Sequence, residues 1–149
     1  MKVIFICHGN ICRSPMGEYI FADLIRKQGK EKFFEVSSAA VSYEEIGNDV
    51  YPPAKRCLVE HGVSCPPHAA HCVTVKEIET ADVLLCMDRS NLRRLAAISP
   101  LGVPKAHLLG EYGLGGAEIE DPWYTGNFRR VYEQIALCCE MLLAVLSEG

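Results

Sequence analysis

The sequence lacks the long apolar runs, the cysteine pairs and the surplus of basic residues that would assign it to several common classes of protein. No segment approaches the roughly 18 uninterrupted apolar residues of a membrane span, so we expect no membrane insertion. The net charge of −4 at pH 7 argues against nucleic-acid and anionic-membrane partners. The 8 cysteines include no Cys-x-x-Cys pair, so neither a zinc site nor a secreted disulfide framework is indicated.

The first residues also lack a signal-peptide pattern, because a strand-like segment follows Met1 and Lys2 directly. Free thiols in a reducing compartment then explain the cysteines, and we expect a cytoplasmic location. The chain has 149 residues, of which 49% are hydrophobic, and it contains no internal repeat and no linker. It is therefore predicted to form one domain over residues 1–149.

What the sequence does contain is a short motif between a predicted strand at residues 3–6 and a predicted helix that Pro15 begins. The motif consists of Cys7, His8, Gly9, Asn10, Ile11, Cys12, Arg13 and Ser14. In a strand–loop–helix arrangement, the backbone N–H groups of residues 9–14 can converge on one point at the positive end of the helix. The motif therefore predicts a binding loop for a phosphate dianion.

Two side chains of this motif carry chemistry. The field that attracts phosphate also favours the thiolate of Cys7, which is then a nucleophile. The planar guanidinium of Arg13 matches two phosphate oxygens, which a lysine could not do. A Cys-x5-Arg spacing by itself is weak evidence for such a site in a cysteine-rich chain. Its position between strand and helix, the close backbone approach allowed by Gly9 and the final Ser14 favour a catalytic phosphate loop.

Strand and helix patterns alternate along the rest of the chain. Further strands are predicted at residues 33–38, 81–87 and 105–108, and helices at 15–28, 52–62, 74–77, 88–98 and 128–146. Residues 39–51 and 110–116 are predicted loops. The buried stripe of the last helix is expected to be Val131, Ile135, Cys138, Leu142 and Val145. Such alternation predicts an α/β fold with a parallel sheet and right-handed crossovers, whose ligands bind at the carboxyl ends of the strands.

A phosphoryl transfer from an ester also needs a general acid for the leaving oxygen, and Asp121 is the best candidate. Pro122 biases the backbone of Asp121 toward an extended, projecting conformation. The neighbouring Trp123 and Tyr124 could form an apolar wall for an aromatic substrate. Without the cysteine loop, the same segment would be interpreted as a plain turn beside core aromatics.

Taken together, residues 7–15 and the Asp121-Pro122 pair resemble the low-molecular-weight protein tyrosine phosphatase family. The resemblance extends over nearly the whole chain, through residues 36–39, His68 and residues 87–88. It implies a four-stranded parallel sheet with helices on both faces, of the flavodoxin-like, phosphotyrosine phosphatase I type. It also implies that Cys7 is the nucleophile, that Arg13 binds phosphate and the transition state, and that Asp121 is first general acid and then base.

The same resemblance implies supporting roles. Asn10 and Ser14 would hold the loop and stabilise the thiolate, with His68 bonded behind it, and Cys12 would be a redox partner that forms a reversible disulfide with Cys7. His8, Gly9 and Ile11 complete the expected phosphate-binding set. No metal and no other cofactor is expected, because Arg13 and the loop amides supply the positive charge; His68 and His71 lack a third ligand nearby.

Some positions depart from the family pattern and bear on the substrate. Ala40-Val41 replaces Gly-Thr, His71 stands for an arginine, Glu44 for an aromatic residue, and His8 follows the nucleophile. The expected substrates are a phosphotyrosine protein or a small aryl phosphate, with inorganic phosphate as the product. Two alternatives stay open on the same fold. A phosphoarginine phosphatase is disfavoured, because in this family a threonine at the position of Ile11 goes with that activity. An arsenate reductase would need two further cysteines in a thiol relay with Cys7, for which Cys72 and Cys86 are the candidates.

Overall fold

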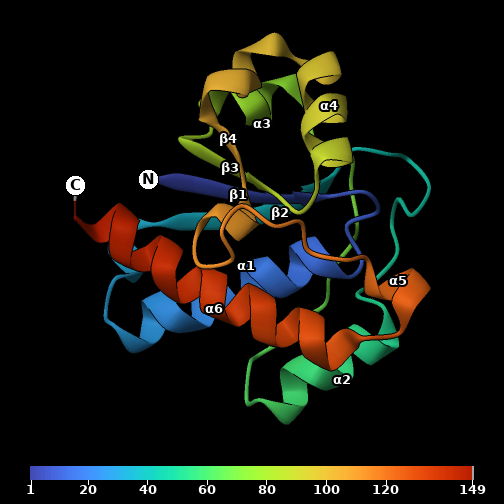
Figure 1. The fold of residues 1–149 in the computed structure, drawn as a ribbon, viewed down its shortest axis with the longest axis vertical. Coiled ribbons are helices and arrows are strands. Elements are labelled where there is room, and N and C mark those ends of the chain that lie inside the picture. The colour runs from blue at the N-terminus through green and yellow to red at the C-terminus, as the bar shows by residue number, and fades with distance from the viewer. Residues whose placement is uncertain (149) are drawn as a thin grey trace.

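The computed structural model describes residues 1–148, and its strands form one parallel sheet. The strands are β1 (Lys2–Cys7), β2 (Glu35–Ala40), β3 (Val83–Cys86) and β4 (Ala106–Leu108), in the spatial order β2-β1-β3-β4 (Figure 1). β1 pairs with β2 from Lys2 opposite Glu35 to Cys7 opposite Ala40. Because β1 lies inside the sheet and is covered on both faces, it is almost continuously apolar. Cys7 is the last residue of β1, so it lies at the carboxyl ends of the strands, where ligands bind in such sheets.

Helices cover both faces of this sheet (Figure 1). On one face lie α1 (Arg13–Lys27), α2 (Pro52–Glu60) and α6 (Phe128–Ser147). On the other face lie α3 (Val75–Thr80) and α4 (Arg89–Ile98). The short α5 (Pro122–Thr125) and the 3₁₀ turns at Glu31–Phe33, Pro100–Lys105 and Leu109–Glu111 complete the regular elements. The predicted single-domain α/β fold with a four-stranded parallel sheet is confirmed. Among the helices of residues 1–148, none has the length and apolar character to cross a membrane.

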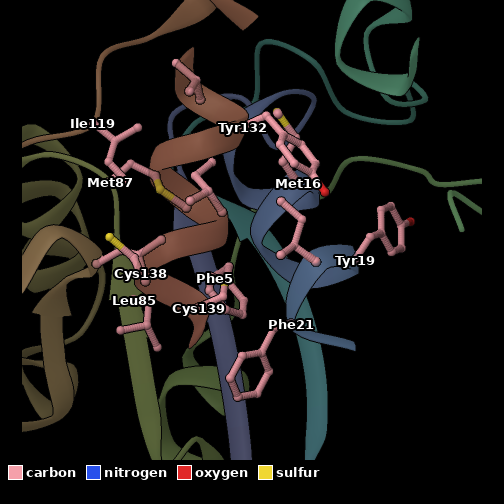
Figure 2. Close-up of a cluster of buried hydrophobic side chains, with 14 of the residues drawn as sticks. Phe5, Met16, Tyr19, Phe21, Leu85, Met87, Ile119, Tyr132, Cys138 and Cys139 are labelled. Carbon is pink, nitrogen blue, oxygen red and sulfur yellow. The ribbon is translucent and has the colours of Figure 1, made fainter. Parts of the chain in front are cut away.

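The larger core lies between β1, β3 and the helices α1, α2 and α6 (Figure 2). Phe5 packs against Phe21 of α1, with ring centroids 5.8 Å apart. Gly17 of α1 permits this approach, because a Cβ there would lie only 2.5 Å from Cδ1 of Phe5. Cys138 and Cys139 of α6 are both fully buried in this cluster, so the adjacent pair serves packing. This core fixes β1 and α1 on either side of the phosphate loop.

Three expectations from the sequence need correction, and one short helix was not predicted. α1 begins at Arg13, so Pro15 occupies its third position instead of its first, where its missing N–H is still harmless. The second strand begins at Glu35 and runs to Ala40, because Phe33 ends a 3₁₀ turn. Val145 is 50% exposed, because Leu142, Leu143 and Leu146 form the core-facing side of these turns and Val145 lies on the other side of the helix. The helix α5 was not predicted, because one turn is too short to show a periodic pattern.

Candidate active site

The loop between β1 and α1 wraps around the thiol of Cys7. The backbone N–H groups of Asn10 and Ser14 point at Cys7 Sγ over 3.3 and 3.4 Å. The hydroxyl of Ser14 lies 3.0 Å from the same sulfur. Asn10 lies in the middle of the loop and Ser14 in the first turn of α1, at the positive end of the helix dipole. Such a ring of N–H groups and a hydroxyl stabilises negative charge on the sulfur or on an anion above it.

Asn10 holds the loop in this shape. Its φ of 60° is the left-handed conformation, which asparagine adopts more readily than most residues. The fully buried side chain donates from Nδ2 to Ser14 Oγ at 2.8 Å and to Ser38 Oγ at 2.9 Å. The carbonyl oxygen of Asn10 lies 2.7 Å from Nε2 of His68, and its Oδ1 accepts from the backbone N–H of His71 at 3.3 Å. His68 therefore lies behind the loop, as expected.

A chain of hydrogen bonds continues from the loop into the protein. The hydroxyl of Ser38 donates to Oε1 of Glu18 at 2.6 Å. Burial raises the pKa of the Glu18 carboxyl above its usual value, although the hydrogen bond from Ser38 opposes this shift. Sequence reasoning missed Glu18 as part of the site, because its link to Cys7 passes through Ser38, Asn10 and Ser14. No sequence spacing could reveal a connection between α1, β2 and the loop.

Arg13 is locked by acceptors from distant parts of the chain. Its NH1 donates to Asp88 Oδ2 at 2.8 Å and to the carbonyl of Ile119 at 2.9 Å, and the residue is only 3% exposed. Burial by itself would lower the pKa of Arg13, but the negative charge of Cys7 and the hydrogen bond to Asp88 raise it above its usual value. Sequence reasoning missed Asp88 as a site residue. The signals for it were its place in the family resemblance, at residues 87–88, and its position as N-cap of α4 shortly after β3.

Asp121 lies beside Arg13 at the same site. Its backbone is extended, with φ −83° and ψ 110°, as the following Pro122 predicted, and it caps α5. Oδ1 accepts from the backbone N–H of Trp123 at 3.0 Å, while Oδ2 lies 3.5 Å from NH2 of Arg13. The carboxylate is thus oriented by α5 and faces the guanidinium of Arg13. Residues 13 and 121 are brought together only by the fold.

The predicted residues line one small pocket with a volume of about 60 Å³. Its lining includes Cys7, His8, Gly9, Ile11, Cys12, Arg13, Asp121, Trp123 and Tyr124, together with Glu44 and Glu45, which sequence reasoning did not assign to the site. Asn10 and Ser14 lie behind this lining, where they bond to Cys7 and to each other. Burial and then the charge of Cys7 raise the pKa of Cys12 far above its usual value.

The mouth of the pocket is more open than its base. His8 Nε2 lies 2.8 Å from Oε2 of Glu44, whose side chain is 68% exposed. Trp123 and Tyr124 are 49% and 83% exposed. The ring of Trp123 packs against Tyr51, with centroids 4.5 Å apart. The two aromatic residues therefore form a wall at the mouth and not part of the core.

The side chains considered for other chemistry are engaged elsewhere. His68 lies against the carbonyl of Asn10, whereas Nε2 of His71 lies 2.9 Å from Oε2 of Glu77. Within residues 1–148, no three His, Cys, Asp or Glu side chains gather as metal ligands do. Cys86 is fully buried in the core under α3 and α4, while Cys7 belongs to the core of the opposite face. The placement of Cys86 therefore disfavours the thiol relay considered for an arsenate reductase.

A thiol in a phosphate-sized loop, a locked arginine and a facing carboxylate on a parallel α/β sheet define a cysteine-dependent phosphoryl-transfer enzyme. Comparison with known proteins gives the family. The model of the family described as low molecular weight phosphotyrosine protein phosphatase matches residues 2–149. The chain belongs to this family of cysteine-dependent hydrolases.

Individual relatives match this chain over almost their full lengths. The low molecular weight phosphotyrosine protein phosphatase of Gallus gallus is 41% identical over 148 residues, covering 95% of this chain and 93% of that protein. The crystal structure of YfkJ from Bacillus subtilis has a TM-score of 0.95 at 34% identity and covers 99% of this chain and 95% of its own. The crystal structure of DARP, a Drosophila arginine phosphatase, has a TM-score of 0.88 at 32% identity, with 98% of each chain covered.

Proposed function

We propose that this protein hydrolyses phosphotyrosine in proteins through a phosphocysteine intermediate on Cys7. The observation that carries the proposal is the environment of the Cys7 sulfur. Two backbone N–H groups and the Ser14 hydroxyl face it within 3.4 Å, in a loop that also presents Arg13 to the same pocket. A site that only bound phosphate would need the N–H groups but no thiolate among them.

In the first step, the Cys7 thiolate attacks phosphorus while the loop amides and Arg13 bind the equatorial oxygens. A sulfur–phosphorus bond forms as the bond from phosphorus to the phenolic oxygen breaks. The leaving oxygen takes the proton of Asp121, so a neutral phenol departs. Asp121 is suited to this role because Trp123 and Arg13 orient its carboxyl at the mouth of the pocket.

In the second step, Asp121 is ionised and accepts a proton from water as the water oxygen attacks phosphorus. The sulfur–phosphorus bond breaks, and inorganic phosphate and the Cys7 thiolate are released. The cycle requires an ionised Cys7 together with a protonated Asp121, so we expect the rate to peak on the acid side of neutrality. A rate that rose steadily up to pH 9 would contradict the role of Asp121.

Arg13 supplies positive charge that another enzyme would take from a metal ion. Asp88 and the carbonyl of Ile119 hold NH1, which leaves the remaining N–H groups of the planar fork to bind two phosphate oxygens. We therefore propose that turnover needs no metal and persists in a chelator. Eight free cysteines support a reducing, cytoplasmic location.

Phosphotyrosine is favoured as substrate by the aromatic and aliphatic lining of the mouth. Ile11, Trp123 and Tyr124 offer apolar surface to a flat phenyl ring. Phosphoarginine is the second candidate, because the structurally similar DARP is named as an arginine phosphatase. We prefer phosphotyrosine because a bulky apolar side chain at Ile11 gives a guanidinium no hydrogen-bonding partner.

The test is phosphate release from a phosphotyrosine peptide and from a phosphoarginine peptide of the same sequence, with Cys7→Ser as the blank. Faster turnover of phosphotyrosine that is absent in Cys7→Ser supports both the reaction and the substrate. Faster turnover of phosphoarginine keeps the mechanism and overturns the substrate. No turnover of either peptide overturns the proposal.

A further inference from the structure

A wide groove beside the phosphate pocket is lined by residues 48–51, by residues of α2 and by Trp123 of α5. Figure 1 shows α2 and α5 on the same side of the molecule. Its volume is about 760 Å³, in the range of ligand-binding clefts, against about 60 Å³ for the phosphate pocket. Ile11, Glu45 and Trp123 line both cavities, so the two are continuous. A substrate that leaves the phosphate pocket over Trp123 enters this groove.

The groove offers an apolar surface that the fold itself does not use. Tyr51 and Trp123 pack against each other at its inner end, with ring centroids 4.5 Å apart. Val59 of α2 lies along it and is 62% exposed. Exposed apolar side chains that line a shared concave surface are typical of a recognition site.

The charged groups at its inner end are already engaged within the protein. Oε2 of Glu45 accepts from the side-chain amide of Asn48 at 2.6 Å. Asp49 accepts from the backbone N–H of Val50 at 2.7 Å and lies 3.6 Å from the Lys55 ammonium. Asp49 is thus paired with a cation, whereas Glu45 bonds a neutral amide and keeps its charge, and Arg56 and Glu60 add one charge of each sign to the lining. An apolar side chain is therefore expected at the aromatic and aliphatic part of the lining, beside Tyr51, Val59 and Trp123.

We propose that the groove binds the polypeptide segment next to the phosphotyrosine of a protein substrate. An apolar side chain of that segment sits between Tyr51, Val59 and Trp123. This inference rests on the proposed phosphotyrosine phosphatase function and names the feature of the substrate that the enzyme selects. The groove adjoins the phosphate pocket, and three residues of an extended chain span about 10 Å, so we expect the selected side chain among the three residues on either side of the phosphotyrosine.

The test uses phosphotyrosine peptides in a glycine and serine background, with one leucine moved through the three positions on each side. Phenyl phosphate, which has no polypeptide chain to extend past Trp123 toward Val59, is the internal control substrate. The variants are Val59→Glu and the matched Val145→Glu. Val59 is 62% exposed near the end of α2, and Val145 is 50% exposed near the end of α6. Only Val59 lines the groove among these two residues.

We expect leucine at one or two positions to raise kcat/KM about tenfold in the wild type, from burial of one apolar side chain. Val59→Glu should remove this preference, Val145→Glu should keep it, and both should turn over phenyl phosphate at the wild-type rate. Peptide affinities measured with Cys7→Ser and with Cys7→Ser combined with Val59→Glu should show the same preference and the same loss, independently of turnover.

Three outcomes would overturn the inference. The first is a kcat/KM and an affinity that do not depend on the position of leucine. The second is an equal loss of the preference in Val145→Glu. The third is concentration-dependent dimerisation that Val59→Glu abolishes, which would assign the groove to a second copy of the chain. Failure of the proposed function is separate, because it would appear as no turnover of phenyl phosphate while peptide binding could still be measured.

Discussion

The base and the mouth of the phosphate pocket are built in opposite ways. At the base, Asn10, Arg13 and Ser14 are 0%, 3% and 0% exposed, and each makes several hydrogen bonds to other parts of the chain. At the mouth, Tyr124 is 83% exposed, and the 68% exposed side chain of Glu44 pairs only with His8 among the described residues. We therefore expect the base to determine the reaction, because its buried groups are joined by hydrogen bonds, and the mouth to determine which substrate is accepted.

Asp121 joins the two regions, so its removal should have the largest effect on turnover. We expect Asp121→Asn to lower kcat on phenyl phosphate by about 10²- to 10⁴-fold, the usual contribution of a general acid. Binding of inorganic phosphate, measured as its inhibition constant, should change little because the loop is intact. The loss should shrink for aryl phosphates whose phenols are more acidic, since these leave without a proton. An equal loss for every leaving group would contradict the role of Asp121.

Substitution of Asn10 should disrupt the hydrogen-bond network at the base of the pocket. Asn10→Gly keeps the left-handed backbone but removes the side chain that bonds Ser14 and Ser38. We expect a fall in the free energy of unfolding of about 1–3 kcal/mol from the polar groups left unpaired, and a fall in kcat/KM of about 10- to 100-fold. Asn10→Ala should lose about 1 kcal/mol more, because alanine resists the left-handed conformation. Wild-type stability and activity in Asn10→Gly would show that the network is dispensable.

Substitution of Cys12 tests whether the base of the pocket also protects Cys7 from oxidation beyond the sulfenic acid. Because burial raises the pKa of Cys12, its thiol stays protonated, and peroxide should oxidise the thiolate of Cys7 first. The Cys12 thiol would then attack the sulfur of the Cys7 sulfenic acid, its proton would pass to the departing hydroxyl, and a disulfide and one water would form. We expect dithiothreitol to restore activity in the wild type but to restore less than a tenth of it, roughly, in Cys12→Ser. Sulfinic acid at Cys7 without a disulfide in the wild type, seen by peptide mapping, would refute this.

At the mouth, the packing of Tyr51 on Trp123 should have a moderate effect, because it orients the helix that carries Asp121. We expect Tyr51→Leu to lower kcat on phenyl phosphate about 3- to 10-fold, from loss of one aromatic pair. Tyr51→Phe keeps the ring and should match the wild type. The loss should again shrink with acidic phenols, since only the proton transfer is misaligned. Equal kcat in Tyr51→Leu and wild type would show that α5 is held without Tyr51.

The same contrast explains what the sequence could predict. The loop residues, the strand before them and the helix after them are contiguous, so residues 7–14 reveal their chemistry by local spacing. Asp121 was found because the reaction needs an acid and Pro122 marks a projecting residue. Asp88 and Glu18 were missed, because their hydrogen bonds to Arg13 and to Ser38 join segments that only the folded sheet brings together. Helix α5 was missed because four residues carry no periodicity.

The smallest expected effect concerns Glu18, at the far end of the network behind the base. Burial raises its pKa in the folded protein above the ordinary 4.5, so the folded state holds this proton to higher pH than the unfolded state does. The wild type therefore loses stability as pH rises from 4.5 through the raised pKa, whereas the amide in Glu18→Gln never ionises. In urea unfolding, Glu18→Gln should have no higher free energy of unfolding than the wild type at about pH 4, and a higher one at about pH 7.5.

Glu44→Gln, at the exposed mouth, is the matched control and should change the free energy of unfolding by less than about 0.5 kcal/mol. An advantage of Glu18→Gln that was equal at both pH values would show that the amide improves packing, and would remove ionisation of Glu18 as its cause.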